Sequence, residues 1–414
     1  MHRLTNVVKP YAWGSRTAIA ELRGLPSPAP TPEAELWMGA HPSSPSRITK
    51  DGSEVALDAC ILHDPEGELG QESLSTFGPK LPFLLKVLAA GAPLSLQAHP
   101  TAAQAKVGFA RENAQGLALD APTRSYKDDN HKPEVLCAVS PFWALSGFRG
   151  AAEAATLLAA LEVPALLPIV ATLRGPNEDG AKIREVFLAL FAHPEKGRLA
   201  SEVIARAEAL GRHGFPAEAE WTARLGKEYP GDVGVVVALL LNLVRLAPGE
   251  ALFLDAGNLH AYLEGTGIEL MASSDNVLRG GLTVKHVDVG GLAEVLEFAP
   301  TGIPRARRVA TPEGTIEYRT SAKEFLLARL MVDGSRPLPK RTGPQILLAV
   351  GGSVVVSRGT ESLVLRSGES AYLPHSAEGV TVSGQGTLFR GTTAIANDRA
   401  NATQTRVADH SGPR

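Results

Sequence analysis

One segment of the chain reads Leu94-Ser95-Leu96-Gln97-Ala98-His99-Pro100, in which polar and apolar side chains alternate. Successive side chains of a β-strand point to opposite faces, so this period of two predicts a strand with one polar and one apolar face. The polar face would carry Ser95, Gln97 and His99 and line a cavity, while the apolar face packs against a core. The segment therefore predicts a β-fold with chemical groups that face inward.

A second segment, Asn258-Leu259-His260-Ala261-Tyr262-Leu263, repeats this pattern far along the chain. On a strand, Asn258, His260 and Tyr262 would share one face. One interpretation is that each histidine only satisfies a local hydrogen bond, which is the usual case for an isolated histidine. Two such polar faces in one chain favour the other interpretation, in which the histidines meet at one site.

A third segment, Asp128-Asp129-Asn130-His131-Lys132-Pro133-Glu134, is charged. On an extended backbone Lys132 and Glu134 face the same way, and Pro133 stiffens the link between them. A charged run of this kind is typical of a solvated loop, but an apolar run over residues 135–139 follows at once. Glu134 is therefore expected at the mouth of a buried strand.

The three segments together offer two imidazoles, one carboxylate and one amide, from His99, His260, Glu134 and Gln97. This donor set suits Zn²⁺. Because the set carries one negative charge, the centre keeps a net positive charge and would act as a Lewis acid on a substrate oxygen. We expect one zinc ion per chain.

Composition limits the remaining possibilities. A chain of 414 residues has room for two or three domains. Its 41 basic and 44 acidic residues nearly balance, so we expect neither a nucleic-acid partner nor a membrane partner. Two cysteines, and no apolar run of the kind found in secretory signals, predict a cytoplasmic location. We expect the protein to be a monomer.

The character of the sequence changes twice along the chain. Alanine, leucine and glutamate at helical spacing predict helices over residues 152–161, 179–191, 199–210 and 235–244. Short apolar runs broken by glycine and proline lie before this region, and β-branched alternation with glycine turns lies after it. These zones predict a mainly β protein with a helical insertion.

We place the domain boundaries at these changes of character. Residues 1–150 and 248–322 would form one β-domain, interrupted by a helical insertion over residues 151–247. A second β-domain would occupy residues 323–397, and residues 398–414 would form a flexible tail.

Six motifs occur in a fixed order: Lys9-Pro10-Tyr11-Ala12-Trp13-Gly14, Trp37-Met38-Gly39-Ala40-His41-Pro42, Ser95-Leu96-Gln97-Ala98-His99-Pro100, Asn130-His131-Lys132-Pro133-Glu134, Gly147-Phe148-Arg149, and a long block over residues 257–285. In these motifs the chain resembles the type I mannose-6-phosphate isomerases (phosphomannose isomerases) along nearly its whole length. The resemblance implies that the zinc ligands are Gln97, His99, Glu134 and His260.

The resemblance also implies a fold and a reaction. The fold would be a cupin-type β-barrel (jelly-roll) catalytic domain, an inserted α-helical domain and a C-terminal β-barrel domain. The reaction would be the zinc-dependent, reversible isomerisation of mannose 6-phosphate and fructose 6-phosphate. A proton would move between C1 and C2 through an enediolate, and the partner would be a small sugar phosphate.

Such a reaction needs a cation beside the developing oxyanion and a group that carries the proton. Arg279 is the expected cation, since it is permanently charged, and a structural salt bridge is the alternative. Lys132 and Asp275 rank equally as the proton carrier, with Glu269 as a further carboxylate. His131 could assist, although on an extended strand it points away from Lys132.

The substrate phosphate needs cationic or hydroxyl donors, and the resemblance supports Ser95, Lys86 and Lys285 in this role. Lys86 lies in an otherwise apolar run, where a buried charge is costly unless it is paired. Trp13 and Tyr262 could form walls against the sugar or belong to the core.

Two other classes of function fit part of this pattern. Two histidines and one carboxylate also occur in iron-dependent cupin oxygenases, but the amide of Gln97 and the extra cations argue against that class. A non-catalytic sugar-phosphate-binding cupin is the second alternative. It would be favoured by loss of a ligand or of Arg279, and neither is lost.

Overall fold

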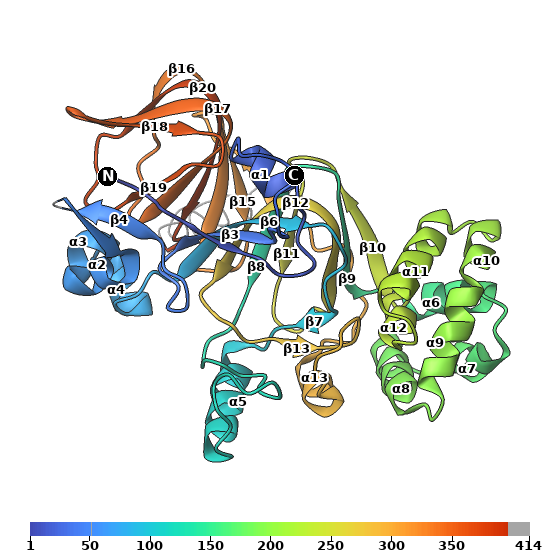
Figure 1. Ribbon diagram of the computed structural model, residues 1–414. Helices are drawn as coiled ribbons and strands as arrows, with labels where there is room; N and C mark the ends of the chain where they lie inside the picture. Colours follow the sequence, from blue (N-terminus) through green and yellow to red (C-terminus); the bar gives the residue numbers. More distant parts are fainter. Residues whose placement is uncertain (51, 396–414) are drawn as a thin grey trace, which may run out of the picture.

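The computed structural model describes residues 1–50 and 52–395, so the tail predicted for residues 398–414 lies outside the described residues. The described chain forms two large β-sheets, a two-stranded ribbon and a set of helices (Figure 1). The predicted mainly β, cupin-type architecture with a helical segment is confirmed. Among the described strands, the hydrogen bonding of neither large sheet closes into a ring.

The first sheet has ten strands, and most of the residues discussed below lie on or beside it. Its strands are β2 (Val7–Lys9), β3 (Glu35–Gly39), β6 (Phe83–Ala90), β7 (Gln97–Ala98), β8 (Glu134–Ala138), β9 (Phe142–Phe148), β10 (Leu241–Leu246), β11 (Ala251–Leu254), β12 (His260–Ala272) and β13 (Leu278–Arg279).

The long strand β12 organises this sheet because it changes partners along its length. Its first residues pair with β7 and β9, and from Gly265 onward it pairs with β6, with β8 joining at Gly267. Gly265 has a φ of 125°, and a Cβ there would lie 2.6 Å from the carbonyl oxygen of Pro141. Only glycine fits this position, so the crossing of β12 between its partners depends on it.

The second sheet has eight strands and takes up most of the C-terminal part of the chain. Its strands are β1 (His2–Arg3), β14 (Arg307–Ala310), β15 (Thr315–Arg319), β16 (Leu326–Pro337), β17 (Gln345–Arg358), β18 (Glu361–Arg366), β19 (Ser370–Leu373) and β20 (Thr381–Thr392). The β-branched alternation seen in the sequence lies in β17, β18 and β20, as predicted. The two-stranded ribbon is β4 (Arg47–Lys50) with β5 (Ser53–Ala56).

Helices flank the sheets, and α6 to α12 form a separate group at one end of the molecule (Figure 1). The helices outside the stretch between β9 and β10 are α1 (Ala18–Leu22), α2 (Leu57–His63), α3 (Pro65–Leu69), α4 (Gln71–Phe77), α5 (Ala102–Ala114) and α13 (Val289–Val295). The helical segment, which lies between β9 and β10 in the chain, contains α6 (Ala151–Ala160), α7 (Leu167–Leu173), α8 (Asp179–Ala192), α9 (Lys196–Ala205), α10 (Ala207–Arg212), α11 (Pro216–Glu228) and α12 (Gly234–Ala238). No helix among the described residues is both long enough and apolar enough to cross a membrane.

Two of the predicted helices end differently from the prediction. The helix expected over 235–244 is wrong in its second half, because α12 ends at Ala238 and strand β10 begins at Leu241. A continuous valine and leucine run carries no periodicity that separates helix from strand, and pairing of β10 with β9 decides the outcome. The helix expected over 199–210 breaks at Arg206 into α9 and α10.

The apolar backs of the two alternating segments pack against the helical segment. One continuous hydrophobic cluster joins residues of α6 to α12 with residues from the backs of both segments, namely Leu96, Ala98, Leu259, Ala261 and Leu263. The prediction of apolar faces that pack against a core is therefore confirmed for these residues. The helices supply that core.

The two large sheets share a second hydrophobic cluster. It contains Leu85 and Ile268 from the ten-stranded sheet and Phe325 and Ile346 from the C-terminal part of the chain. The C-terminal sheet is thus packed directly on the sheet that carries the polar segments. The domain boundaries placed after residues 150, 247 and 322 stay a prediction.

Candidate metal centre and active site

Three buried side chains from separate segments meet at one point. His99 follows β7, and Glu134 and His260 begin β8 and β12. Strand pairing brings them together, since His260 lies opposite Gln97 and Glu134 lies opposite Met271. One ligand atom from each of His99, Glu134 and His260 lies within 4.8 Å of the others. The Nε2 atoms of His99 and His260 are 3.4 and 3.7 Å from the two oxygens of Glu134.

The outer nitrogen of each histidine fixes the orientation of its ring. Nδ1 of His99 lies 2.7 Å from the carbonyl oxygen of Asn276, and Nδ1 of His260 lies 3.0 Å from that of Asn258. A carbonyl oxygen only accepts, so each Nδ1 carries the proton and each Nε2 presents a lone pair to the centre.

The inner atoms of this cluster lack partners. Among the described residues, no hydrogen bond reaches Nε2 of His99, Nε2 of His260 or Oε2 of Glu134, although all three atoms are buried. Buried polar atoms of folded proteins nearly always have a partner, and a bound ion can be that partner. Two imidazole nitrogens and a carboxylate facing one point fit a zinc ion.

The protonation states agree with metal binding. Burial, assisted by the charge of His99, lowers the pKa of His260 to about 4. Burial and the neighbouring Lys132 lower the pKa of His99 as well. Burial alone would raise the pKa of Glu134, but Lys132 and His99 hold that pKa well below its usual value. At neutral pH the three groups are therefore in the forms that bind metals.

Gln97 lies beside this cluster along the backbone. Its Cα is opposite that of His260 on β12 and that of Arg279 on β13. It is half-buried. Gln97 as the fourth ligand stays a prediction.

Lys132 and His131 point in opposite directions, as the extended backbone predicts. Lys132 Nζ donates to Glu134 Oε1 over 2.8 Å. His131 Nε2 lies 2.7 Å from Glu324 Oε1, on the side of the C-terminal sheet. Lys132 thus belongs to the metal centre, whereas the ring of His131 lies outside it.

A second buried charge cluster lies on β6. Lys86 Nζ is 3.2 Å from Glu35 Oε1 on β3 and 3.1 Å from Glu269 Oε2 on β12. Burial alone would lower the pKa of Lys86, but these carboxylates raise it. Burial raises the pKa of Glu269 to about 7 against the opposing effect of Lys86. Lys86 is therefore paired with two carboxylates, and phosphate binding by Lys86 stays a prediction.

Tyr262 closes this cluster on one side. Its hydroxyl donates to Glu269 Oε1 over 3.1 Å, and its ring packs edge-on against Phe142. Trp13 is half-buried and packs against the hydrophobic cluster that contains Phe142 and Tyr262. With only 1% of its surface exposed, Tyr262 belongs to the core in this structure. Contact of Trp13 or Tyr262 with a sugar stays a prediction, as does phosphate binding by the half-buried Ser95.

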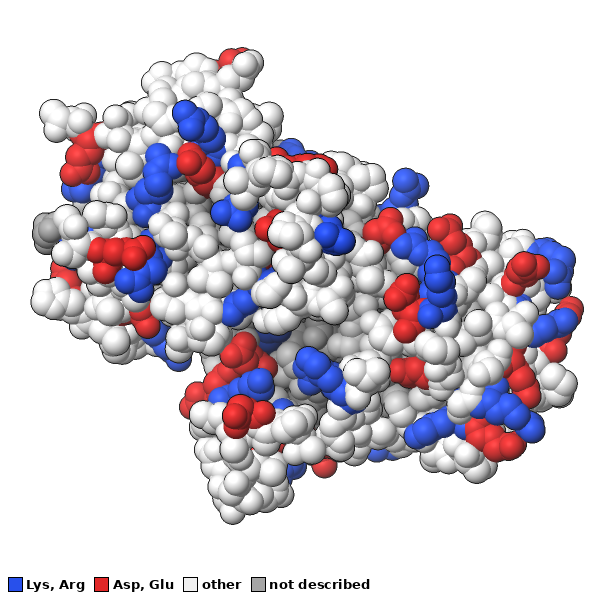
Figure 2. Space-filling model, viewed as in Figure 1, with Lys and Arg blue, Asp and Glu red and all other residues white. Residues whose placement is uncertain are grey.

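A cation-rich cavity of about 470 Å³ is lined in part by residues 275, 277 and 279. None of His99, Glu134 and His260 lines it, but the carbonyl of Asn276 in the same segment contacts His99. The lining of the cavity includes Lys127, Asp275, Arg279 and Lys285. Among the described residues no acidic group lies within ion-pair distance of Arg279, and its role stays a prediction. Burial lowers the pKa of Arg279, and burial with Arg279 lowers that of Lys285. Figure 2 shows lysine and arginine side chains, together with some acidic ones, around a hollow on this face of the molecule. The excess of cations favours an anionic ligand.

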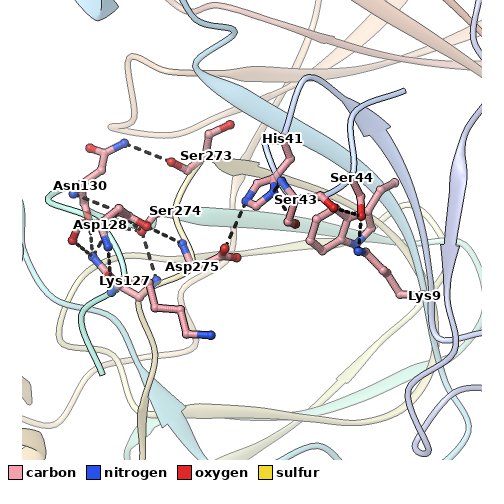
Figure 3. Close-up of polar contacts among 12 residues, drawn as sticks. Lys9, His41, Ser43, Ser44, Lys127, Asp128, Asn130, Ser273, Ser274 and Asp275 are labelled. Atoms are coloured by element: carbon pink, nitrogen blue, oxygen red, sulfur yellow. Dashed lines mark hydrogen bonds and ion pairs between the residues drawn. The ribbon is translucent and has the colours of Figure 1, made fainter. Parts of the chain in front are cut away.

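His41 holds Asp275 in place (Figure 3), a role that no pattern considered above predicted. His41 Nε2 lies 3.4 Å from Asp275 Oδ2, and the backbone N–H of Asp275 donates to Asp128 Oδ2 over 2.8 Å. The ring of His41 packs edge-on against Trp37. The sequence did hold a signal, because the motif over residues 37–42 puts a histidine just after a short apolar run.

The pair of Asp275 and His41 predicts a pH effect on stability. Burial alone would raise the pKa of Asp275, but the hydrogen bond and charge of His41 lower it from 3.8 to about 2. A carboxyl whose folded pKa is depressed stabilises the protein above its unfolded pKa, and this contribution disappears as the pH falls toward 2. The stability lost by Asp275→Asn should therefore be larger at pH 5 than at pH 3.

Urea unfolding of the wild type and the variant at both pH values measures this difference. Asp333→Asn, on the exposed side of β16, is the control and should show no such change. An equal loss for Asp275→Asn at pH 5 and pH 3 would show that His41 does not depress this pKa.

Comparison with known proteins adds the following findings. Residues 1–151 match the family described as phosphomannose isomerase type I, catalytic domain. The mannose-6-phosphate isomerase of Escherichia coli (strain K12) is 39% identical over 394 residues, which cover 94% of this chain and 99% of that protein. The human mannose-6-phosphate isomerase is 34% identical and covers 86% of this chain, with 89% of its own length matched.

Solved structures show the same similarity. A variant of the phosphomannose isomerase from Salmonella typhimurium superimposes with a TM-score of 0.88 at 37% identity, over 95% of this chain and 99% of that one. A zinc-bound mannose 6-phosphate isomerase superimposes with a TM-score of 0.87, at the same identity and coverage.

Proposed function

The chain belongs to the type I mannose-6-phosphate isomerases, and from this premise we propose that it interconverts mannose 6-phosphate and fructose 6-phosphate with one zinc ion per chain. The observation that carries the proposal is the buried cluster of His99, Glu134 and His260, whose inner atoms lack partners, together with a cation-lined cavity. These three residues, with Gln97 as the fourth, would hold the ion.

When bound, zinc supplies a Lewis acid that draws electron density from a substrate oxygen. The chain supplies the rest of the electrostatic environment. Arg279, which has no ion-pair partner among the described residues, faces the same cavity as Lys285. We propose that Arg279 stabilises the negative charge of the developing enediolate and that Lys285 binds the phosphate. Lys86 and Ser95 are further predicted donors to the phosphate. A fixed cation needs no reorganisation when charge develops, which is why it stabilises the transition state.

The proton carrier is chosen among three groups by their environments. A general base works best when its pKa lies near the operating pH. The pKa of Glu269 is about 7, whereas that of Asp275 is about 2. This comparison favours Glu269 over Asp275, and Lys132 remains the candidate nearest to the metal ligands because it contacts Glu134. The position of Asp275 in the cavity suits binding of sugar hydroxyls.

The remaining parts of the proposal concern the setting of the enzyme. The family acts on a sugar phosphate, and we propose a monomer that needs neither nucleic acid nor a membrane. The near balance of 41 basic and 44 acidic residues supports this. A cytoplasmic location is supported by two buried cysteines, Cys60 and Cys137, that form no disulfide.

A coupled assay tests the activity directly. Incubated with mannose 6-phosphate, the zinc-loaded protein should produce fructose 6-phosphate, detected through enzymes that convert that product onward with a change in absorbance. Mannose without the phosphate should react far more slowly, because the cation-lined cavity would have no anion to bind. A zinc-loaded, folded protein without turnover would favour the non-catalytic binding protein.

A further inference from the structure

Glu324 belongs to the C-terminal part of the chain, yet its side chain reaches the segment that carries Lys132 and Glu134. It lies two residues before β16, and its Oε1 is 2.7 Å from His131 Nε2. Most of the carboxylate is buried, with 12% of the side chain exposed. The contact therefore joins the C-terminal sheet to the extended segment just before β8, beside the metal centre.

The position of Glu324 is fixed from its own side. The next residue, Phe325, is buried in the hydrophobic cluster that both large sheets share. The preceding residue, Lys323, accepts a hydrogen bond at its carbonyl from the backbone of Ala394, over 3.1 Å. Because both neighbours are anchored, the carboxylate of Glu324 approaches His131 from a rigid base.

Hydrogen bonds to the backbone also hold the segment that receives this contact, residues 130–134. The carbonyl oxygen of Asn130 accepts a bond from the amide of Asn276 over 2.8 Å, and that of Pro133 accepts from the backbone of Ala272 over 3.1 Å. Between these two points the rings of His131 and Pro133 and the chain of Lys132 are the only side chains. In extended backbone successive side chains point to opposite faces, so a rotation of the backbone at His131 would also redirect Lys132.

The contact favours the charged forms of both His131 and Glu324. The hydrogen bond to Glu324 raises the pKa of His131 against the effect of burial. Burial alone would raise the pKa of Glu324, but His131 lowers it. Charge-assisted hydrogen bonds of this kind are shorter and stronger than neutral ones.

From this geometry we propose that Glu324 is a positioning residue for the isomerase reaction. By holding His131 on the outer side of the segment, it keeps Lys132 directed at Glu134, 2.8 Å away. The inference rests on the proposed function and gives the C-terminal sheet a part in catalysis, through a residue that touches neither substrate nor metal ligand.

The surroundings of the pair support action through His131. The pair lines a cavity of about 540 Å³ together with Asp255 and Ser321. The lining of this cavity includes none of His99, Glu134 and His260. The contact of the Glu324 carboxylate with His131 leads from this cavity to the metal centre through residues 131–134. An amide has the same shape as the carboxylate, so Glu324→Gln leaves the packing around the pair unchanged and removes only the charge.

The test compares Glu324→Gln with the wild type under saturating mannose 6-phosphate. Misplacing a catalytic group by about 1 Å costs up to roughly 10²-fold in rate. For a smaller displacement we expect kcat to fall about tenfold. KM should change less than about twofold, because substrate-binding groups are untouched. Zinc content and the midpoint of thermal unfolding should stay close to those of the wild type. Glu378→Gln is the matched control and should leave kcat unchanged. Glu378 is an exposed carboxylate in the loop between β19 and β20 and is paired with Lys340.

A double-mutant cycle shows whether the effect passes through His131. In the background of His131→Asn, the further change Glu324→Gln should lower kcat by much less than it does alone, since coupled residues are not additive. Glu324→Asp keeps the charge but shortens the side chain, so it should retain more activity than the Gln variant; it also replaces that variant if the latter does not fold.

Each other result overturns the inference. An unchanged kcat for Glu324→Gln in an active wild-type enzyme would leave Glu324 without a role in the reaction. Equal losses of kcat in both backgrounds, together with a lowered unfolding midpoint, would make Glu324 a structural residue only. A wild type that does not convert mannose 6-phosphate would contradict the proposed function itself, which is a different outcome.

Discussion

Prolonged chelation is expected to remove one zinc ion per chain and to lower the rate of isomerisation on the order of 10³-fold, since a Lewis acid supplies several kcal/mol of transition-state stabilisation. The structure gives the reason. His99, Glu134 and His260 face one point with three buried atoms that no other described group satisfies. Without the ion these atoms stay unpaired, so the metal-free protein should also lose local order. Addition of zinc should restore both.

Elemental analysis and turnover of the chelated and the reloaded protein measure these effects. Two variants sharpen the assignment. His260→Ala should bind almost no zinc, whereas His375→Ala should bind as much as the wild type, because His375 lies in the C-terminal part of the chain and its Nδ1 is 2.6 Å from the carbonyl of Thr342. Full activity in metal-free protein, or two tightly bound zinc ions per chain, would show that the site is assigned wrongly.

Arg279→Ala should lower kcat by roughly 10²–10³-fold, the scale observed when one donor to an oxyanion is removed. Arg279 has no ion-pair partner among the described residues and lies in the cation-lined cavity with Asp275 and Lys285. If it acts mainly on the enediolate, it stabilises the transition state more than the bound substrate, so KM should change much less than kcat. Zinc content should stay intact.

Two further variants complete this experiment. Arg279→Lys should restore only part of the rate, because a point charge lacks the planar fork of the guanidinium. Arg111→Ala, which removes an exposed cation on α5, should leave kcat unchanged. A normal kcat with a greatly raised KM would instead assign Arg279 to the phosphate, and the stabilisation of the enediolate would pass to zinc or to Lys132.

Local patterns in the sequence predicted the positions of the chemical groups well. The alternation around His99 and His260 placed both on polar faces with apolar backs, and the extended segment of residues 130–134 placed Lys132 and His131 on opposite sides. These predictions hold because they depend on backbone geometry over two or three residues. Side-chain direction at this range is fixed locally, whatever the rest of the fold does.

Contacts between distant strands were beyond the sequence. The partners of Lys86, on β3 and β12, are separated from it by 51 and 183 residues. The pair of His41 and Asp275 likewise joins segments that meet only through the folding of the ten-stranded sheet. Strand β10 was mistaken for a helix for the same reason, because its pairing with β9 outweighs the local preference of its residues.

The entry and exit of the helical segment have a consequence for the architecture of the molecule. Phe148, the last residue of β9, lies opposite Leu241, the first residue of β10, in an antiparallel ladder. Partners in such a ladder are about 5 Å apart, so the whole helical segment occupies the place of a hairpin turn. A short turn could span this gap and leave the order of the strands unchanged.

Such a shortened chain would nevertheless be a poor enzyme. The apolar backs of the metal-bearing segments, including Leu96 and Leu259, would face water. The bond from the backbone of Thr283 to Asp232, which ties the loop after Arg279 to the helical segment, would also be lost. The order of the strands would therefore survive removal of the helical segment, but the packing behind the metal-bearing segments would not.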